Sequence, residues 1–333
     1  MVTESLISII IPVFNRTEVV KNTLDSVLAQ TFKDWECIIV DDGSTDNSWE
    51  VLEEYEQKDN RFKIHKRNRE PKGASTSRNL GRKLAKGRYV IFLDSDDLMT
   101  VDCLDYRLNK IHENPNNSAW IFGTGVFNKE IGDTNIIWNK LNTKEDDVVR
   151  FLNQDMPWHT SGPVWLNNNL LHFNEQALSF QDWEYHLRFL VQKKNYYKDL
   201  DDKLTGYYRM DKLQSSISAN TFKTIQLTNR IEVILETSKV INFHTSKYDL
   251  DILKLIFRST RLLKTHGLKS EAYSSWDFAK GYFNISKVNS IILSAFLHLE
   301  NKNNIRMLEF IIFRIFRKGY LLNFNSSFLS CIK

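Results

Sequence analysis

The sequence predicts an α/β protein built on an open, mostly parallel sheet. Over the first hundred residues, four short apolar segments rich in β-branched residues alternate with segments whose apolar residues recur at helical spacing. The apolar segments are nearly uninterrupted, which is typical of strands covered on both faces. With 333 residues, 42% of them hydrophobic, the chain is long enough to bury a full core.

The first two strand–helix units have clear ends. The strand predicted at residues 6–13 is LISIIIPV, and the helix after it has apolar residues at helical spacing, namely Val20, Leu24, Val27 and Leu28. The strand at residues 35–40 is WECIIV, and it runs into the polar loop DDGSTDNS. In that loop Asp46 or Asn47 is expected to cap a helix over residues 49–58.

The later units are less regular. A weaker strand is predicted at residues 61–65, and the glycine-containing stretch EPKGASTSRN leads to a helix around residues 80–85, closed by Gly87. The fourth strand, at residues 89–93, delivers three aspartates. Beyond it we expect a helix at residues 101–112, a strand at 119–126, a mixed segment to about 157, a helix starting close to Asp182, and an almost wholly helical region at 222–318.

Polar clusters follow three of these strands, at residues 12–15, 41–46 and 94–97. Ligands of open parallel sheets bind at the carboxyl ends of the strands, so we expect the clusters to share one crevice. Asp94, Asp96 and Asp97 would raise one another's pKa unless a cation or strong donors lay among them. Carboxylates favour Mg²⁺ or Mn²⁺, whose open positions suit phosphate oxygens. The alternative is that these acids are solvated and cap the next helix.

Several other classes of protein fit the sequence poorly. An EF-hand match at Asp42, Ser44, Asp46 and Glu53 has Asn47 where that loop needs Gly. Neither GxGxxG nor GxxxxGK[ST] follows the first strand. The cysteines Cys37, Cys103 and Cys331 are too scattered for a disulfide framework or a zinc site, which favours a reducing compartment. The N-terminus lacks the basic start of a signal peptide, and no apolar run is long enough to cross a membrane.

Four blocks, in their order and spacing, resemble the family 2 glycosyltransferases of the GT-A fold: ISIIIPVFNR, QTFKDWECIIVDDGSTDNS, GASTSRNLGRKLAKGRYVIFLDSDD and FNEQALSFQDWEYHLRFL. The resemblance covers roughly residues 5–215. It implies a catalytic domain at residues 1–220, with residues 221–333 as a C-terminal helical region. It also implies inverting transfer of a hexosyl or N-acetylhexosaminyl group from a nucleotide sugar, with UDP-sugars as the expected donors. The acceptor would be a glycan or a lipid-linked glycan in cell-surface polysaccharide synthesis, and the cofactor Mn²⁺ or Mg²⁺.

The resemblance also implies roles for residues of the donor site. The segment Pro12, Val13 and Phe14 is similar to the family's nucleotide-base edge, and Asp42 to the Asp that hydrogen-bonds the base. Asp94 and Asp96 match the two aspartates of the DxD motif, which lie near the diphosphate and bind the metal. Asp97 is a neighbour without an assigned role. Arg78 is similar to a position near the nucleotide pocket, although it could equally pair with an acid at a helix terminus.

Asp182 falls where the family has its general base, the carboxylate that takes the proton of the acceptor hydroxyl. Considered without the family, Asp182 would be a helix N-cap. Gln181 stands where Glu is usual, and Met210 and Asp211 stand where the family often has His, so the third metal ligand is left open. The remaining expectations are that Arg209 meets the diphosphate and that three side chains line the acceptor side, where aromatic faces stack on sugars or fill the core: Trp158, His159 and Trp183.

The charge is uneven along the chain. Residues 231–333 carry 15 Lys and Arg against 8 Asp and Glu, whereas the first 230 residues have a net charge of −3. The segment NIRMLEFIIFRIFRKGYLL is expected either to lie in an anionic membrane interface or to pack as a buried helix. No nucleic-acid recognition motif accompanies the charge. We therefore expect a cytoplasmic protein, held peripherally at the inner face of the cell membrane, that does not bind nucleic acid.

Two functions from other classes stay open at this stage. Gln181 and the absent His are compatible with a non-catalytic subunit that binds a nucleotide sugar or a glycan. A nucleotidyltransferase would also bind its substrate and a metal in such a crevice. However, the glycine-rich basic phosphate loop expected of that class near the first strand is missing.

Overall fold

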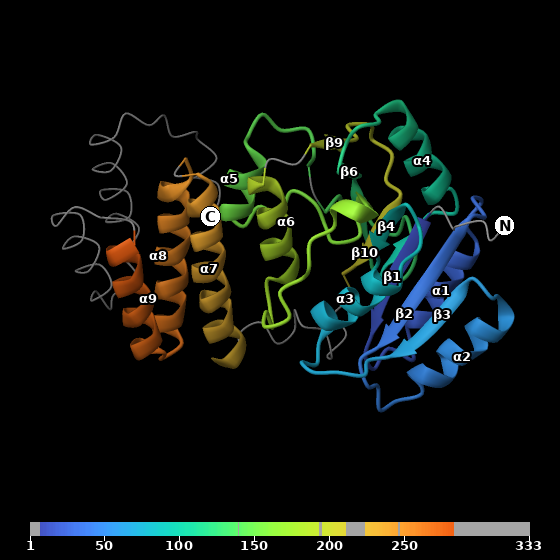
Figure 1. Ribbon diagram of the computed structural model, residues 1–333, viewed down its shortest axis with the longest axis horizontal. Coiled ribbons are helices and arrows are strands. Elements are labelled where there is room, and N and C mark those ends of the chain that lie inside the picture. The colour runs from blue at the N-terminus through green and yellow to red at the C-terminus, as the bar shows by residue number, and fades with distance from the viewer. Residues whose placement is uncertain (1–6, 139, 193–194, 211–223, 246, 283–333) are drawn as a thin grey trace. The chain divides into compact units, whose positions relative to one another are not determined.

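The computed structural model describes residues 7–138, 140–192, 195–210, 224–245 and 247–282, and it divides into two compact units, Met1–Ile256 and Phe257–Lys333. The first unit contains a seven-stranded sheet with the order β3-β2-β1-β4-β8-β6-β9 (Figure 1). Its strands are β1 (Ile7–Val13), β2 (Trp35–Asp41), β3 (Phe62–Lys66), β4 (Tyr89–Phe92), β6 (Ala119–Ile121), β8 (Pro163–Leu166) and β9 (Tyr196–Lys198). Only β8 runs antiparallel to its neighbours, so the predicted mostly parallel sheet is confirmed.

The chain reverses its direction of travel across the sheet at β1. The first strands step outward from β1 to β2 and β3, and the chain then returns to place β4 on the other side of β1. The register sets Ile7 opposite both Trp35 and Tyr89. Such a switch point leaves a crevice at the carboxyl ends of the flanking strands, which here are β1 and β4. The three predicted polar clusters follow β1, β2 and β4.

Helices cover both faces of these strands. One face packs against α1 (Val20–Leu28), α2 (Ser48–Lys58) and α4 (Cys103–Glu113), and their shared core includes Ile9 and Ile11. The other face carries α3 (Ala74–Leu84), which packs on β1 and β2. A Cβ at Gly81 would overlap the side chain of Ile10, so the close approach of α3 to β1 depends on this glycine.

A second, smaller sheet has the order β5-β10-β7, formed by β5 (Leu98–Met99), β7 (Thr124–Phe127) and β10 (Gly206–Arg209). The strand predicted at residues 119–126 is therefore two strands, β6 and β7, that belong to different sheets. Gly123 lies at the change of sheet, where a Cβ would come within 2.9 Å of the side chain of Leu204. The mainly apolar run AWIFGTGV did not reveal this change of direction.

The start of α3 also differs from the prediction. The helix begins at Ala74, directly after Gly73 with φ of 139°, rather than near residue 80. The residues Ser75, Thr76 and Ser77 are polar, which suggested a loop, yet the structure buries all three. At the start of α2, Asp46 Oδ1 accepts a hydrogen bond from the Ser48 backbone nitrogen at 3.0 Å, and Asn47 makes no side-chain cap. Of the two predicted caps, Asp46 is the one confirmed.

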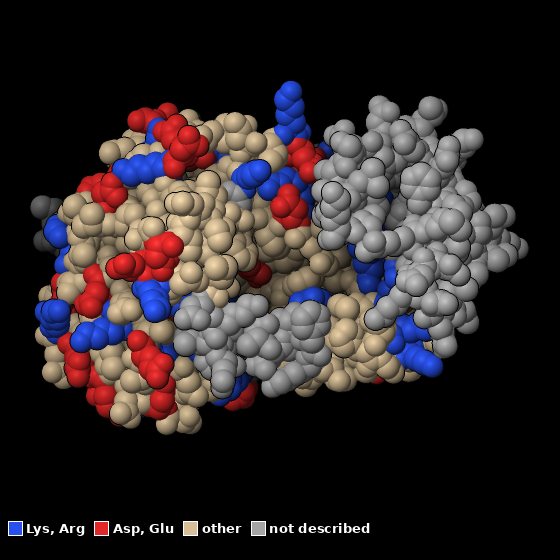
Figure 2. Space-filling model, turned by 180° about the vertical axis from the view of Figure 1, so that it is seen from behind, with Lys and Arg blue, Asp and Glu red and all other residues tan. Residues whose placement is uncertain are grey.

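The remaining described elements are helical. The first unit contains α5 (Asp147–Leu152), the short 3-10 helix η1 (Asn167–Asn169), α6 (Gln181–Val191) and α7 (Thr224–His244), with α6 packed against both α5 and α7. Farther along the chain are α8 (Asp249–Thr265) and α9 (Lys269–Tyr282), and in the second unit the rings of Phe257 and Trp276 meet edge to face at 5.7 Å. Basic and acidic side chains are interspersed on the face shown in Figure 2.

Three sequence-based expectations fall on other parts of the chain. The domain boundary expected at residue 220, the position of Asp211 and the basic segment at residues 305–333 lie outside the described residues. Among the helices in the described ranges, none combines the length and the apolar character that crossing a bilayer requires.

Candidate active site

The ends of β1 and β2 form the part of the crevice expected to hold the nucleotide base. The Asp42 backbone nitrogen donates to the Val13 carbonyl at 2.8 Å, which joins the two strand ends. Pro12 and Val13 are buried, whereas Phe14 is partly exposed and has the Lys72 ammonium 3.6 Å from its ring centroid. Of the three residues expected at the base edge, Phe14 is therefore the one whose side chain is accessible.

Asp42 is buried but electrostatically compensated. Its Oδ1 accepts from Arg67 Nε at 2.6 Å and from the Gly73 backbone nitrogen at 3.1 Å, and Ser77 Oγ lies at 3.5 Å. All three contacts involve Oδ1, which leaves Oδ2 for a further donor in the part of the chain described. The preceding Asp41 has a different task, because its Oδ2 accepts from the Gly43 and Ser44 nitrogens and closes the turn.

At the end of β4, Asp94 forms a short ion pair with Arg78. Arg78 Nη2 lies 2.6 Å from Asp94 Oδ1, and Nη1 donates to Gln181 Oε1 at 3.1 Å. Burial alone would raise the pKa of Asp94, but the Arg78 guanidinium leads the charges that hold it below its usual range. The pairing of Arg78 with an acid is therefore confirmed, and its place near the nucleotide pocket stays a prediction.

The other two aspartates of the turn are less well compensated. Asp96 lies 3.9 Å from Arg16 Nε, and burial followed by the charge of Asp94 raises its pKa. Asp97 is fully buried, and burial followed by the charges of Asp96 and Asp94 raises its pKa well above the usual range. Its Oδ1 accepts from the Arg209 backbone nitrogen at 3.1 Å. This crowding of acids is the charge imbalance that a cation would relieve.

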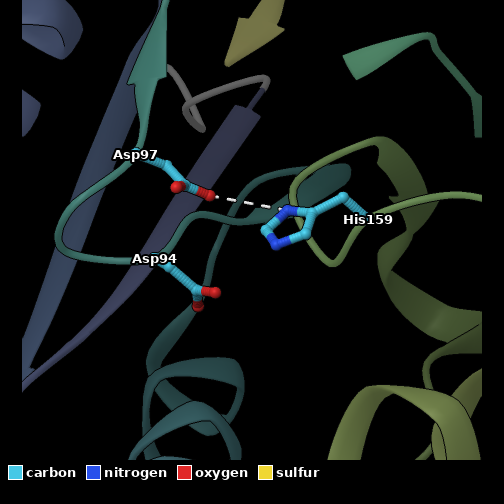
Figure 3. Close-up of side chains that lie close together, drawn as sticks. All are labelled: Asp94, Asp97 and His159. Carbon is cyan, nitrogen blue, oxygen red and sulfur yellow. Dashed lines mark ion pairs between the residues drawn. The ribbon is translucent and has the colours of Figure 1, made fainter. Parts of the chain in front are cut away.

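A group of possible metal ligands forms where the turn after β4 faces residue 159. One ligand atom each from Asp94, Asp97 and His159 lies within 4.8 Å of the other two. Figure 3 shows the imidazole turned toward the two carboxylates, with His159 Nδ1 at 3.5 Å from Asp97 Oδ2. Burial holds the pKa of His159 below its ordinary value, although Asp94 opposes the shift, and the neutral ring is the form that coordinates metals. These residues fit a divalent cation.

The site combines expected and unexpected residues. Asp94, one of the two predicted ligands, belongs to this candidate group, while Asp96, the other, does not and lies 3.9 Å from Arg16 Nε. His159 was expected on the acceptor side, and the sequence offered no sign that it would meet Asp97. A lone His in the stretch PWHTSG becomes a candidate ligand only when the fold brings that stretch to the end of β4.

Asp182 lies in the first turn of α6, close to this group. The helix begins at Gln181 after Phe180, which adopts the left-handed conformation with φ of 60°, so the predicted N-cap role of Asp182 is wrong. Its Oδ1 accepts from the Trp183 backbone nitrogen at 2.8 Å, and Oδ2 lies 3.4 Å from Thr160 Oγ1. Its charge acts on His159.

Arg209 is tied to the turn that holds the aspartates. Its Nε donates to the Asp96 carbonyl at 3.0 Å and its Nη1 to the Asn128 carbonyl at 3.1 Å. Its Nη2 is buried and has no hydrogen-bond partner among the described residues. A guanidinium held at this place with a donor to spare suits an anion, and the expected contact with a diphosphate stays a prediction.

Two of the three residues expected to contact the acceptor lie in the core instead. Trp158 is 0% exposed and packs against Phe151 and His186, and Trp183 is 1% exposed with its Nε1 donating to the Phe151 carbonyl at 2.8 Å. Neither ring presents a face to a sugar, so the expected stacking role does not fit these side chains. Their large apolar area stabilises the packing between α5 and α6.

Gln181 has a structural role that its sequence position did not reveal. Its Oε1 accepts from Arg78, and its Nε2 donates to the Ala177 carbonyl at 2.9 Å, so one amide links α3 to the start of α6. We expect Gln181→Leu to lower the free energy of unfolding by about 1–3 kcal/mol, because it leaves a buried guanidinium donor unpaired. Gln181→Glu keeps an acceptor and should be less destabilising. Urea unfolding of both variants checks this, and equal losses would contradict it.

Comparisons with known proteins identify the family. The model of the family described as Glycosyl transferase family 2 matches residues 8–164. Escherichia coli WfgD, a UDP-Glc:alpha-D-GlcNAc-diphosphoundecaprenol beta-1,3-glucosyltransferase, is 32% identical over 224 residues, which are 66% of this chain and 83% of WfgD. The chain spans only 18% of the length of each of two Rickettsia glycosyltransferases, to which it is 45% and 46% identical over 112 residues.

Solved structures agree with the predicted GT-A fold. Residues 1–349 of Staphylococcus aureus TarS, solved with UDP-GlcNAc, superpose with a TM-score of 0.63 at 18% identity, covering 96% of this chain and 93% of that one. The mannosyltransferase PcManGT of Pyrobaculum calidifontis, solved with GDP-Man and Mn²⁺, gives a TM-score of 0.52 at 13% identity, covering 96% and 88%. With the fold of these enzymes and the sequence match to WfgD, the chain belongs to glycosyl transferase family 2.

Proposed function

We propose that this protein is an inverting glycosyltransferase that moves a sugar from a UDP-sugar to a glycan or lipid-linked acceptor in cell-surface polysaccharide synthesis. The observation that carries the proposal is the arrangement at the end of β4. There, Asp94, Asp97 and His159 form a candidate cation site, and the carboxylate of Asp182 acts on His159 from α6. An acid-rich cation site beside a second carboxylate is what transfer from a nucleotide diphosphate sugar requires.

The relatives support the substrate classes. The name of WfgD gives UDP-Glc as its donor and a diphosphoundecaprenol-linked sugar as its acceptor, and this chain covers 83% of WfgD. TarS was solved with UDP-GlcNAc. A UDP-linked hexose or N-acetylhexosamine and a lipid-linked acceptor sugar are therefore the first substrates to test.

The donor is proposed to bind across the ends of β1, β2 and β4. Oδ2 of Asp42 would accept a hydrogen bond from the base, and the ring of Phe14 would offer an apolar edge to it. Asp94, Asp97 and His159 would hold Mn²⁺ or Mg²⁺, which neutralises charge on the departing diphosphate when bound. Arg78 orients Asp94 through the 2.6 Å ion pair, and Arg209 supplies a partly buried cation at the same turn.

The acceptor proton is proposed to pass to Asp182. The acceptor oxygen forms a bond to the anomeric carbon as the bond from that carbon to the diphosphate breaks, and the hydroxyl proton moves to the carboxylate. Asp182 Oδ1 is held by the Trp183 nitrogen, while Oδ2 has only a 3.4 Å contact with Thr160 Oγ1 and is the better placed acceptor of the proton. Attack opposite the leaving group inverts the anomeric centre.

The test is a donor and acceptor screen with the full-length chain. UDP-Glc, UDP-GlcNAc and GDP-Man are incubated with Mn²⁺ or Mg²⁺ and with a GlcNAc-α-diphosphate carrying a short lipid tail. We expect transfer from a UDP-sugar and no transfer without a divalent cation. Metal-dependent UDP binding with neither donor hydrolysis nor transfer would favour the non-catalytic binding subunit instead. Pyrophosphate released from a nucleoside triphosphate would favour a nucleotidyltransferase.

We further propose that residues 1–220 are the catalytic domain and that the helical region at 221–333 holds the protein at the inner face of the cell membrane. Two observations support this. Residues 231–333 include 15 basic and 8 acidic residues, and the name of WfgD gives a lipid-linked acceptor. Removing residues 305–333 is expected to weaken sedimentation with anionic vesicles, because basic residues contribute about 1 kcal/mol each near such a surface. Neutral vesicles are the control, and unchanged sedimentation with a less stable fold would indicate a buried helix.

A further inference from the structure

An exposed aromatic side chain lies next to the candidate active site on a segment that the sequence did not single out. Trp138 is 36% exposed, and its neighbours Ile136 and Ile137 are 48% and 53% exposed. The segment pairs with β7: the Trp138 nitrogen donates to the Thr124 carbonyl at 2.9 Å, and the Ile136 carbonyl accepts from the Val126 nitrogen at 2.9 Å. Residues 136–138 therefore lie antiparallel beside β7, joined to it by an isolated bridge between Ile137 and Gly125.

Strand geometry decides which side of this segment meets the site. Ile137 pairs with Gly125, and the side chains of a strand alternate between its faces, so Trp138 projects on the side opposite to Ile137. On that side the Trp138 ring lies 4.7 Å from the ring of Tyr208 in β10 and 5.2 Å from the ring of His159. The rings of His159 and Tyr208 are 5.0 Å apart. Three rings thus form one cluster.

The buried end of this cluster is part of the active site. His159 is 6% exposed and belongs to the candidate ligand group, and the charge of Asp182 acts on it. The exposed end is Trp138. The cluster consequently runs from the proposed reaction centre to the surface, and the smaller sheet contributes Tyr208 to it.

We propose that Trp138, supported by Tyr208, is the platform on which the acceptor sugar stacks. This rests on the proposed function. A pyranose presents an apolar face of C–H groups. The indole ring of Trp138 meets the His159 ring edge to face and the Tyr208 ring at a tilt of 56°, so it offers a large, supported apolar face at little entropic cost. The donor is held from the strand ends of the larger sheet, so the side of His159 that carries Trp138 is the side from which an acceptor hydroxyl reaches Asp182.

The apolar surface of Ile136 continues the platform on the same side of the segment. A ring stacked on Trp138 would have Ile136, 48% exposed, on the same side of the segment, which suits an acceptor whose sugar is followed by a diphosphate and an apolar tail. The occupant is therefore a lipid-linked acceptor sugar. A second copy of the chain covering this patch is the competing occupant, and the experiment separates the two.

The experiment compares Trp138→Ala, Trp138→Phe and Ile137→Ala in the full-length chain. Ile137 is the matched control, because it is an exposed apolar residue on the same segment that projects to the opposite side. The probe is GlcNAc-α-diphosphate with a short lipid tail, with soluble GlcNAc as a second probe. Binding is measured by calorimetry in the presence of UDP and Mn²⁺, and transfer from the active UDP-sugar is measured alongside.

We expect Trp138→Ala to weaken acceptor binding and raise the acceptor KM about tenfold, which corresponds to about 1.4 kcal/mol. Trp138→Phe should recover most of this, and Ile137→Ala should resemble the unmodified protein. UDP binding should be the same in all three variants, which shows that the donor site is intact.

Three results would overturn the proposal. The first is Trp138→Ala with unchanged acceptor binding and KM, even if the protein is an active glycosyltransferase. The second is an equal loss of UDP and acceptor binding, because Trp138 would then only support the fold. The third is a dimer that forms in sedimentation experiments only when Trp138 is present, together with acceptor binding that is the same for the dimer and for the diluted monomer. A failure of the proposed function would give a different result. The unmodified chain would then transfer no sugar, while the acceptor-binding measurements would still show whether Trp138 contributes.

Discussion

Asp182→Asn is expected to lower kcat for sugar transfer by about 10²–10⁴-fold, the usual contribution of a positioned general base. The amide keeps an oxygen for the Trp183 nitrogen, which now donates to Asp182 Oδ1 at 2.8 Å, so the first turn of α6 should stay in place. What the variant loses is the ability to take the acceptor proton. Binding of the UDP-sugar, whose contacts lie on the strand ends, should change by less than about threefold, a difference below 1 kcal/mol.

The measurement is steady-state transfer with the active UDP-sugar, together with calorimetric UDP binding in the presence of Mn²⁺. Asp202→Asn is the matched control, because it removes the same charge from an exposed carboxylate outside the site. It should leave both quantities unchanged. If Asp182→Asn retained full activity, another group would have to accept the proton and the proposed mechanism would be wrong.

The sequence predicts the first strands of the larger sheet well, because these strands are buried along their whole length. Every residue of β1 and β2 is buried, and their apolar runs are as continuous as expected for strands between two layers of helices. The same reasoning did not predict the start of the helix α3. Its first turn is made of Ser75, Thr76 and Ser77, whose hydroxyls suggest a loop, and they are buried because α3 approaches β1 so closely at Gly81.

The candidate site was predictable only where its residues are near one another in the sequence. Asp94, Asp96 and Asp97 stand together after one strand, so their crowding is visible without a structure. His159 reaches them from the segment before β8, and Trp138 reaches His159 from a segment that bridges to β7 at Ile137. No periodicity links these segments. For the same reason Trp138 was overlooked, while Trp158, in a more suggestive stretch, is a core residue.

Asp94→Asn is expected to lower kcat/KM by at least about 100-fold and to abolish most of the Mn²⁺ dependence of UDP binding. Asp94 belongs both to the DxD pattern and to the candidate ligand group in the structure. Its expected role as a ligand is therefore the same whether Asp96 or Asp97 is the second carboxylate. Substitutions that merely support a metal ligand cost about 10–100-fold in affinity, and loss of the ligand itself should cost more. The Asn oxygen can still accept from Arg78, which now lies 2.6 Å from Asp94, so the fold should persist.

Mn²⁺ titrations of UDP binding measure this effect, again with Asp202→Asn as the control, and an unchanged Mn²⁺ response in Asp94→Asn would refute the cation site. The same titration decides between the neighbours of Asp94. The structure brings Asp97 to His159, with Oδ2 3.5 Å from Nδ1, whereas Asp96 has Arg16 at 3.9 Å. If the structural group binds the cation, Asp97→Asn and His159→Ala should weaken the Mn²⁺ response and Asp96→Asn should affect it less. The reverse order would mean that the turn after β4 rearranges to present Asp96 when the donor and the cation bind.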